Sequence, residues 1–232
     1  MAIDQSIWMA VAARPQRRIS VESRDMGSAE VSLDHIERSG GYVDYVAGVI
    51  ALGDPLNCGL DLWIDSDLPV GAGLSSSAAL SVASVLAVTE VIGGQWDPLK
   101  AAHLARRVEN EWVGVATGIM DQLVIAGAVS GAASLIDCRS LQITQIPLPA
   151  KAAIAVLDSG TRRQLVSSEY NERRAACERA ADFLGVDKLR DADLDMLDCS
   201  LLAPPDSRRA RHVITENART LEFAQAIGQG EL

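Results

Sequence analysis

Apolar residues recur along this chain with two periods, one typical of strands and one typical of helices. Within residues 60–65, apolar residues alternate with Trp63 and two aspartates, which predicts a strand with one buried face. The segments SIWMAVAA (6–13) and RISVES (18–23) flank a turn-like RPQ and predict the two strands of a hairpin. Three further segments predict strands: AASLID (132–137), LQITQIPL (141–148) and AAIAVLDS (152–159).

Longer apolar stretches between these strands indicate helices. Residues 75–92 are mostly Ala, Val and Leu with small hydroxyls, and they are followed by Gly93-Gly94, so we predict a buried helix with a glycine stop. Asp97-Pro98 predicts the start of a helix that runs through Glu109, because aspartate caps helices and proline is tolerated in their first turn. Three more helices are predicted, one beginning in GIMDQLVIAG (118–127), one from about Ser168 to Leu184, and one after Pro204-Pro205-Asp206.

The order of these elements defines the class of fold and a division of the chain. Strands and helices are mixed without a regular βαβ alternation, so the predicted class is α+β. The segment PLPAK (147–151) is the best linker candidate, which predicts one domain over 1–148 and a second over 149–232. A chain that starts inside an apparent strand also suggests that an N-terminal piece is missing.

Composition and charge exclude several classes of function. The formal net charge is -10 and the basic pairs are short and scattered, which argues against binding to nucleic acid. The chain has no secretory signal, no CxxC pair and no clustered histidines, so structural disulfides and a zinc site are not expected. No apolar run is long enough to span a membrane. We therefore expect a cytosolic protein with no membrane and no evident protein partner.

The segment LPVGAGLSSSAAL (68–80) is the most informative of the chain. Gly71 and Gly73 permit backbone conformations that are closed to other residues, and three serines follow at the start of the long apolar helix. The first amides of a helix lack internal partners and the helix dipole favours negative charge there, so this segment is suited to a polyphosphate. The alternative is a Gly-Ser loop with an ordinary serine cap.

The full string resembles the second motif of the GHMP kinases, P-x-x-x-G-L-S-S-S-A-A. The resemblance extends over nearly the whole chain and narrows to the galactokinases. Their motifs are similar to four ordered blocks here: LPVGAGLSSSAAL, ENEWVGVATGIMDQL (109–123) with SLIDCRSL (134–141), SSEYNERRAACERA (167–180) and RARHVITENAR (209–219). The resemblance implies an ATP-binding domain over 1–148 with a fold like that of ribosomal protein S5 domain 2. It also implies a partial ferredoxin-like domain over 149–232.

The resemblance implies transfer of a phosphoryl group from ATP to the anomeric hydroxyl of galactose, with Mg²⁺ as cofactor. By the resemblance, Ser77 and Glu109 are the metal ligands; the alternative for Glu109 is a solvated helix carboxylate. The residues expected to cradle the ATP phosphates are Gly71, Ala72, Gly73, Leu74, Ser75, Ser76 and Ser77.

By the same resemblance, Asp121 is the catalytic base that accepts the proton of the sugar hydroxyl. Its alternative role is a cap for the helix that follows. Gly118 is expected to let the main chain approach the sugar, and Tyr170 to lie against the sugar unless it is a core residue. The segment 42–49 departs from the family pattern W-x-N-Y-x-K-G-V, which weakens the case for adenine stacking on Tyr42.

Two galactokinase motifs do not occur in this sequence. The first, G-R-x-N-L-I-G-E-H-T-D-Y, carries an arginine beside the base and most sugar contacts; the third is G-G-G-F-G-G. We therefore expect a fragment with little or no galactokinase activity by itself. A kinase for another sugar (arabinose, a uronic acid or N-acetylgalactosamine) and a non-catalytic sensor of sugar and ATP remain open alternatives.

Overall fold

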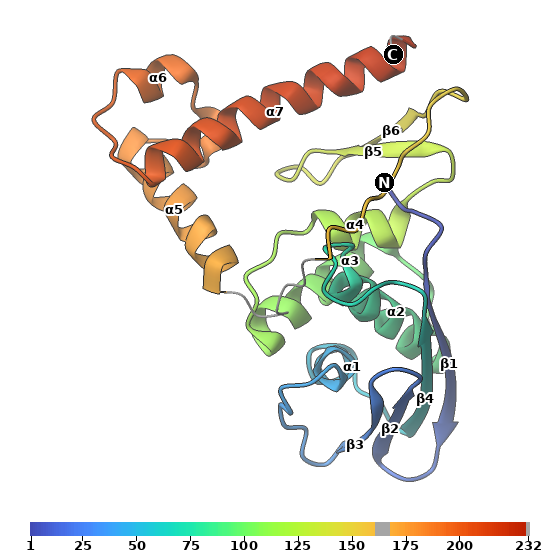
Figure 1. Cartoon of the computed structure of the whole chain (residues 1–232). Coiled ribbons are helices and arrows are strands. Elements are labelled where there is room, and N and C mark those ends of the chain that lie inside the picture. The colour runs from blue at the N-terminus through green and yellow to red at the C-terminus, as the bar shows by residue number, and fades with distance from the viewer. Residues whose placement is uncertain (161–167, 231–232) are drawn as a thin grey trace. The chain divides into compact units, whose positions relative to one another are not determined.

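The computed structural model describes residues 1–160 and 168–230, and it divides into two compact units (Figure 1). The first contains Met1–Thr144, and the second contains Gln145–Ala155 and the helices that follow residue 167. In the described residues, no helix is long and apolar enough to cross a membrane. The domain boundary between residues 148 and 149 stays a prediction.

A four-stranded sheet forms one layer of the first unit, and its strand order differs from the predicted hairpin. The strands are β1 (Ile7–Arg14), β2 (Arg18–Ser23), β3 (Gly27–Ser32) and β4 (Gly59–Ser66), in the order β1-β4-β2-β3. Strand β4 pairs antiparallel with β1 and parallel with β2, so the predicted pairing of β1 with β2 is wrong. A strand inserted between the two satisfies both of its rows of backbone hydrogen bonds.

Gly59 allows the connection between β1 and β2 to pass the start of β4. A Cβ atom at this position would lie only 1.9 Å from the carbonyl oxygen of Gln16 and 2.4 Å from that of Arg18. Because backbone atoms cannot yield as a flexible side chain can, only glycine fits here. The strand order therefore depends on a close approach of backbone segments that are far apart in the sequence.

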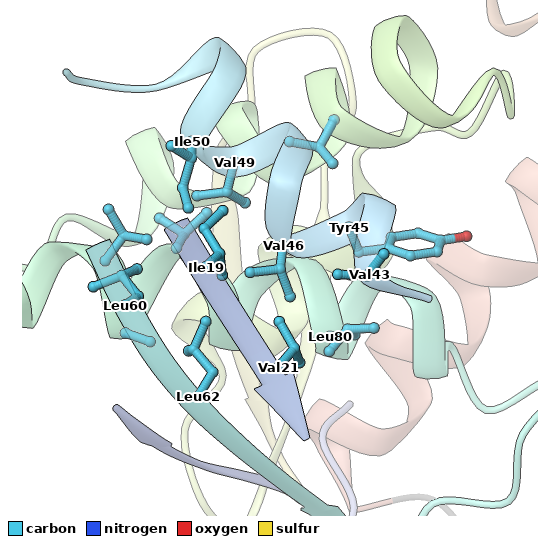
Figure 2. Packing of buried hydrophobic residues seen from close by; sticks show 14 of the residues in the cluster. Ile19, Val21, Val43, Tyr45, Val46, Val49, Ile50, Leu60, Leu62 and Leu80 are labelled. Atoms are coloured by element: carbon cyan, nitrogen blue, oxygen red, sulfur yellow. The ribbon is translucent and has the colours of Figure 1, made fainter. Parts of the chain in front are cut away.

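The predicted alternation in β4 is confirmed, and its buried face forms the core of the first unit. Leu60 and Leu62 are buried, whereas Trp63 is 43% exposed. Figure 2 shows Ile19 and Val21 of β2 beside these leucines, facing apolar side chains of the helices. The covering helices are α1 (Val43–Leu52) and α2 (Ser76–Val91); α1 was not predicted as a helix.

Helices α2 and α4, together with the π-helical turn that follows α3, carry the two carboxylates of the candidate site and their hydrogen-bond partners. The predicted buried helix with its glycine stop is confirmed as α2, which Gly93 follows with a φ of 70°. Helix α3 (Pro98–Arg107) begins as predicted, because the Asp97 side chain accepts hydrogen bonds from the amides of Leu99 and Lys100. A π-helical turn, η1 (Val108–Val113), continues α3, and α4 (Met120–Gly127) lies where the third helix was predicted.

Two of the three additional strands exist in the structure. They are β5 (Ala132–Ile136) and β6 (Ile143–Pro147), which form a two-stranded sheet. Apolar residues of this hairpin pack on α3 and α4 around Ile119 and Leu123. The prediction of a strand over 152–159 is wrong, because a strand needs a hydrogen-bonded neighbour and no described strand pairs with this exposed segment.

The second unit is mainly helical in its described part. Its elements are α5 (Ser168–Leu184), the short 3-10 helix η2 (Leu189–Asp191), α6 (Leu194–Asp198) and α7 (Asp206–Gln229). The predicted helices at 168–184 and after Asp206 are confirmed. A small cluster that includes Ala180, Leu197 and Ala210 holds these helices together.

Candidate active site

The loop that precedes α2 has the unusual backbone that the sequence predicted. Gly71 and Gly73 have φ angles of 72° and 84°, a region that favours glycine. Ser75 also lies in the left-handed region, with φ 58° and ψ 34°, although it carries a side chain. Such a conformation costs free energy and is commonly retained at functional sites.

Ser75 does not act as an ordinary helix cap. It occupies the position before α2, yet its side chain makes no capping hydrogen bond. Its hydroxyl instead donates to Oδ2 of Asp121 at 2.8 Å, across 46 residues of sequence. In its left-handed conformation, Ser75 thus joins the loop to the first turn of α4.

Asp121 is not the cap of α4 either. The residue at the cap position is Ile119, and Asp121 is the second residue of the helix and partly buried. Ser75 donates to Oδ2 of Asp121, and none of the described hydrogen bonds uses Oδ1. The Oδ1 atom can therefore accept a proton from a substrate. A carboxylate in this condition can serve as a general base.

A second contact joins the serine loop to Glu109. The Ser77 hydroxyl donates to Oε2 of Glu109 at 3.4 Å, a long hydrogen bond, and Nε2 of Gln122 donates to Oε1 at 2.7 Å. Glu109 is only 2% exposed, which excludes its alternative role as a solvated helix carboxylate. Three elements, α2, η1 and α4, thus meet around this carboxylate.

Burial is the main cause that raises the pKa of Glu109. Hydrogen bonds from Gln122 and Ser77 act in the opposite direction and lower this pKa, and the nearby charge of Asp121 raises it further. In the described part of the chain, no lysine or arginine forms an ion pair with Glu109. The described hydrogen bonds to this side chain therefore come from neutral donors alone.

Glu109 lies in the π-helical turn η1. The amides of Gly114 and Val115 both donate to the carbonyl oxygen of Glu109, at 2.9 and 2.8 Å, where the regular helical pattern is broken. Turns of this kind occur mostly as single insertions in helices and are frequent at functional sites. The sequence pattern predicts a helix through Glu109 and gives no sign of this turn.

The residues present fit a hard divalent cation. Mg²⁺ prefers oxygen ligands and is usually bound by one or two carboxylates together with substrate phosphates, not by a complete protein cage. Ser77 and Glu109 supply a hydroxyl and a buried carboxylate that has no cationic partner in the described residues. No group of three or more His, Cys, Asp or Glu side chains that could hold a metal is found in that part of the chain.

The two further residues expected to contact the sugar, Gly118 and Tyr170, are exposed, unlike the carboxylates. Gly118 is exposed just before α4, and a Cβ atom there would meet nothing within 4 Å, so the chain's own packing does not require glycine. Tyr170 belongs to the second unit and is 45% exposed on α5, which excludes its alternative role as a core residue. The structure does not bring Tyr170 and Asp121 together within one unit.

The segment that departs from the family pattern has structural roles in this chain. The Tyr42 hydroxyl donates to the carbonyl oxygen of Gly27 at 2.7 Å, which ties the start of α1 to β3. Asp44 is buried and accepts hydrogen bonds from the amides of Ser39 and Gly40. Ala47 is completely buried in the core, where a lysine would have no solvent for its charge.

Sequence reasoning missed Gln122, although this residue directly follows Asp121. Gln122 is 1% exposed and contacts Glu109. A polar residue at the start of an apolar helix gives no sign of its partner, because that partner lies on another element. Only its position in the motif that includes Asp121 could have drawn attention to it.

Comparison with known proteins agrees with this fold. Residues 39–128, which include the serine loop and both carboxylates, match the family described as GHMP kinases N terminal domain. The solved structure of Lactococcus lactis galactokinase complexed with galactose superimposes with a TM-score of 0.89 at 24% identity, over 98% of this chain and 63% of that one. A D-glycero-D-manno-heptose 1-phosphate kinase gives a TM-score of 0.58 at 15% identity, over 98% and 63% of the two chains.

Over residues 39–128 the chain matches the GHMP kinase family, and its α+β fold is that of the solved galactokinase. Over its whole length the chain is similar to galactokinases. It is 41% identical to the galactokinases of Chloroflexus aurantiacus and of Chloroflexus aggregans over 253 aligned positions, which cover 100% of this chain and 63% of each relative. The chain thus spans somewhat less than two thirds of the length of these relatives.

Proposed function

We propose that this chain is part of an ATP-dependent sugar 1-kinase that phosphorylates the anomeric hydroxyl of galactose. The observation that carries the proposal is the link from one serine loop to two carboxylates, Ser75 to Asp121 and Ser77 to Glu109. A loop that leads into a helix N-terminus suits a phosphate chain, and the carboxylates suit a base and a metal ligand. The whole-length similarity to galactokinases supports galactose as the sugar.

The serine loop is the proposed site for the phosphates of ATP. The left-handed residues Gly71, Gly73 and Ser75 turn the backbone just before α2, and the Ser75 side chain does not cap the first turn of this helix. Its amides therefore remain available to phosphate oxygens, and the helix dipole adds to the attraction. Ala72, Leu74 and Ser76 complete the proposed loop.

Ser77 and Glu109 are the proposed ligands of Mg²⁺. When bound, the cation would neutralise negative charge on the phosphate oxygens and so favour their transfer. The protein supplies a site that is organised in advance, since Glu109 is buried and accepts a hydrogen bond from Gln122. Such preorganisation is the main contribution that a protein makes to phosphoryl transfer.

Asp121 is the proposed base. Its Oδ1 atom accepts the proton of the anomeric hydroxyl as the sugar oxygen forms a bond to the γ-phosphorus, and the bond from that phosphorus to the β-phosphate oxygen breaks, releasing ADP. Ser75 donates to Oδ2 and so holds the carboxylate in one orientation. Gly118, three residues earlier, leaves open space in which the sugar can approach the main chain. Tyr170 is the proposed sugar contact from the second unit.

Replacement of Ser77 tests the nucleotide site. In the full-length gene product, Ser77→Ala should weaken the use of Mg·ATP and raise its KM, while galactose binding is largely retained. Ser84→Ala is a matched control, because Ser84 is buried on the same helix and its hydroxyl donates only to the carbonyl of Leu80. Unchanged kinetics with ATP and Mg²⁺ in Ser77→Ala would contradict the assignment.

The substrate is tested in the same assay by release of ADP with different sugars. We expect turnover with galactose to exceed turnover with arabinose, galacturonate and N-acetylgalactosamine. Preference for one of the other sugars would keep the kinase and change its substrate. Binding of galactose and ATP without any turnover would instead identify a non-catalytic sensor.

A further inference from the structure

Gln122 is a buried polar residue that takes no part in the chemical step of the proposed reaction. It lies in the first turn of α4, directly after Asp121, and is 1% exposed. Its Nε2 atom donates to Oε1 of Glu109 at 2.7 Å, a shorter contact than the 3.4 Å between Ser77 and Oε2. A hydrogen bond from an amide to a carboxylate at this distance is strong.

The two oxygens of Glu109 are divided between two neighbours. Oε1 is engaged by Gln122, and Oε2 lies next to the Ser77 hydroxyl. The terminal torsion of a glutamate side chain has a broad energy profile, so the plane of its carboxylate is set by the groups around it. A short hydrogen bond to one oxygen consequently determines which way the other oxygen points.

The side-chain oxygen of Gln122 shows that this residue is not explained by packing alone. Its Oε1 atom is buried and has no hydrogen-bond partner in the described residues. An unpaired buried acceptor lowers stability, and an apolar side chain of the same size would avoid this cost. The contact with Glu109 is the one described interaction that an apolar residue at this position could not make.

We propose that Gln122 is a positioning residue that holds Oε1 of Glu109, so that Oε2 faces Ser77 and the two form a preset cation site. The inference rests on the proposed function, because it assumes that Ser77 and Glu109 hold the cation. Asp121 and Gln122 are consecutive, so the first turn of α4 orients both the base and the metal ligand. Residues behind a metal ligand commonly tune its affinity in this way.

The test measures binding of Mn²⁺, as a substitute for Mg²⁺, to the full-length gene product saturated with ADP, by electron paramagnetic resonance. Gln122→Met keeps the length of the side chain and removes the donor, and it should weaken Mn²⁺ binding by about tenfold or more. ADP binding measured without metal should not change. Leu123→Met is the matched control, because Leu123 is the next buried residue of α4 and has no donor for Glu109.

The possible outcomes separate this inference from the proposed function. If Gln122→Met binds Mn²⁺ as tightly as the wild type, the positioning role is wrong and the nucleotide site stands. If the wild type itself binds no Mn²⁺ with ADP, both proposals are wrong. Should Gln122→Met fail to fold, Gln122→Asn decides, because it keeps the amide but withdraws it by one methylene. If Gln122→Asn binds Mn²⁺ more weakly than the wild type and binds ADP unchanged, the positioning role is supported. If it binds Mn²⁺ as tightly as the wild type, the role is contradicted.

Discussion

Carboxylates in two regions of the first unit have different partners. On the solvent side of the sheet, Asp61 pairs with Arg14 at 2.5 Å and Asp65 pairs with Arg24 at 3.0 Å. At the helix ends, Glu109 and Asp121 accept hydrogen bonds only from serine hydroxyls and a glutamine amide among the described residues. The carboxylates of the first region pair with arginines, and those of the second have no cationic partner among the described residues.

The difference separates carboxylates that serve the fold from those that we assign to the reaction. Surface ion pairs such as those on the sheet each contribute about 0–1 kcal/mol to stability, because water screens them. A buried carboxylate without a cation lowers stability, and the raised pKa of Glu109 reflects mainly its burial. A protein retains such a group where a ligand or a reaction needs its charge.

Removal of the charge at Asp121 should have the largest effect. Asp121→Asn keeps the shape and removes the proton acceptor, so kcat for galactose should fall by about two to four orders of magnitude. The measurement is release of ADP by the full-length gene product, with circular dichroism to verify folding. A loss below about tenfold in a folded variant would show that the transfer proceeds without this base.

Removal of the charge at Glu109 should affect binding and stability in opposite directions. Glu109→Gln should weaken the affinity for Mn²⁺ with ADP by about tenfold or more. Because burial raises the pKa of Glu109, the folded wild type binds its proton more tightly than the unfolded chain does. The stability of the wild type should therefore fall as pH rises from the ordinary range of a glutamate through this raised pKa, and the stability of Glu109→Gln should not.

The sheet supplies the control for this comparison. Asp61→Asn removes the 54% exposed carboxylate of one ion pair on the sheet, so its free energy of unfolding should change by no more than about 1 kcal/mol and its metal binding should not change. Denaturant unfolding at several pH values measures the free energy of unfolding of Asp61→Asn and of Glu109→Gln. A parallel pH dependence in Glu109→Gln and the wild type would show that the Glu109 charge does not affect stability.

A pair of tyrosines should give the smallest effect. The Tyr45 hydroxyl is buried without a partner in the described residues, whereas the Tyr42 hydroxyl bonds to Gly27. We expect Tyr45→Phe to be neutral or slightly stabilising at pH 7, and Tyr42→Phe to cost about 1 kcal/mol. Thermal unfolding of the two variants checks this order; an equal loss in both would mean that the Tyr45 hydroxyl has a partner.

Tyr45 should also make the stability of the wild type and of Tyr45→Phe differ at high pH. Burial, with smaller contributions from Glu109 and Asp44, raises the pKa of Tyr45 to about 12 from 10.0. The unfolded chain loses this proton first, so the wild type should lose stability between about pH 10 and 12, and Tyr45→Phe should lose less.

Much of the fold could be predicted because its signals are local. The alternation in β4, the glycine stop of α2 and the Asp97-Pro98 start of α3 each depend on neighbouring residues, and all three are confirmed. The serine loop and Asp121 were identified by their motifs. The strand order could not be predicted, because β4 comes between β1 and β2 through pairing across more than 40 residues.

The sequence by itself determined most of the elements, the left-handed glycines of the loop and the resemblance to a kinase family, because side-chain periodicity, caps and motifs depend on consecutive residues. Only the tertiary structure decided which polar groups meet. Ser75 reaches Asp121, and Gln122 reaches Glu109, only because α2, η1 and α4 pack together. Burial of Glu109 depends on the same packing, since a π-helical turn and two neighbouring helices enclose it. Contacts between distant segments arise from the whole core, and no single stretch of sequence specifies them.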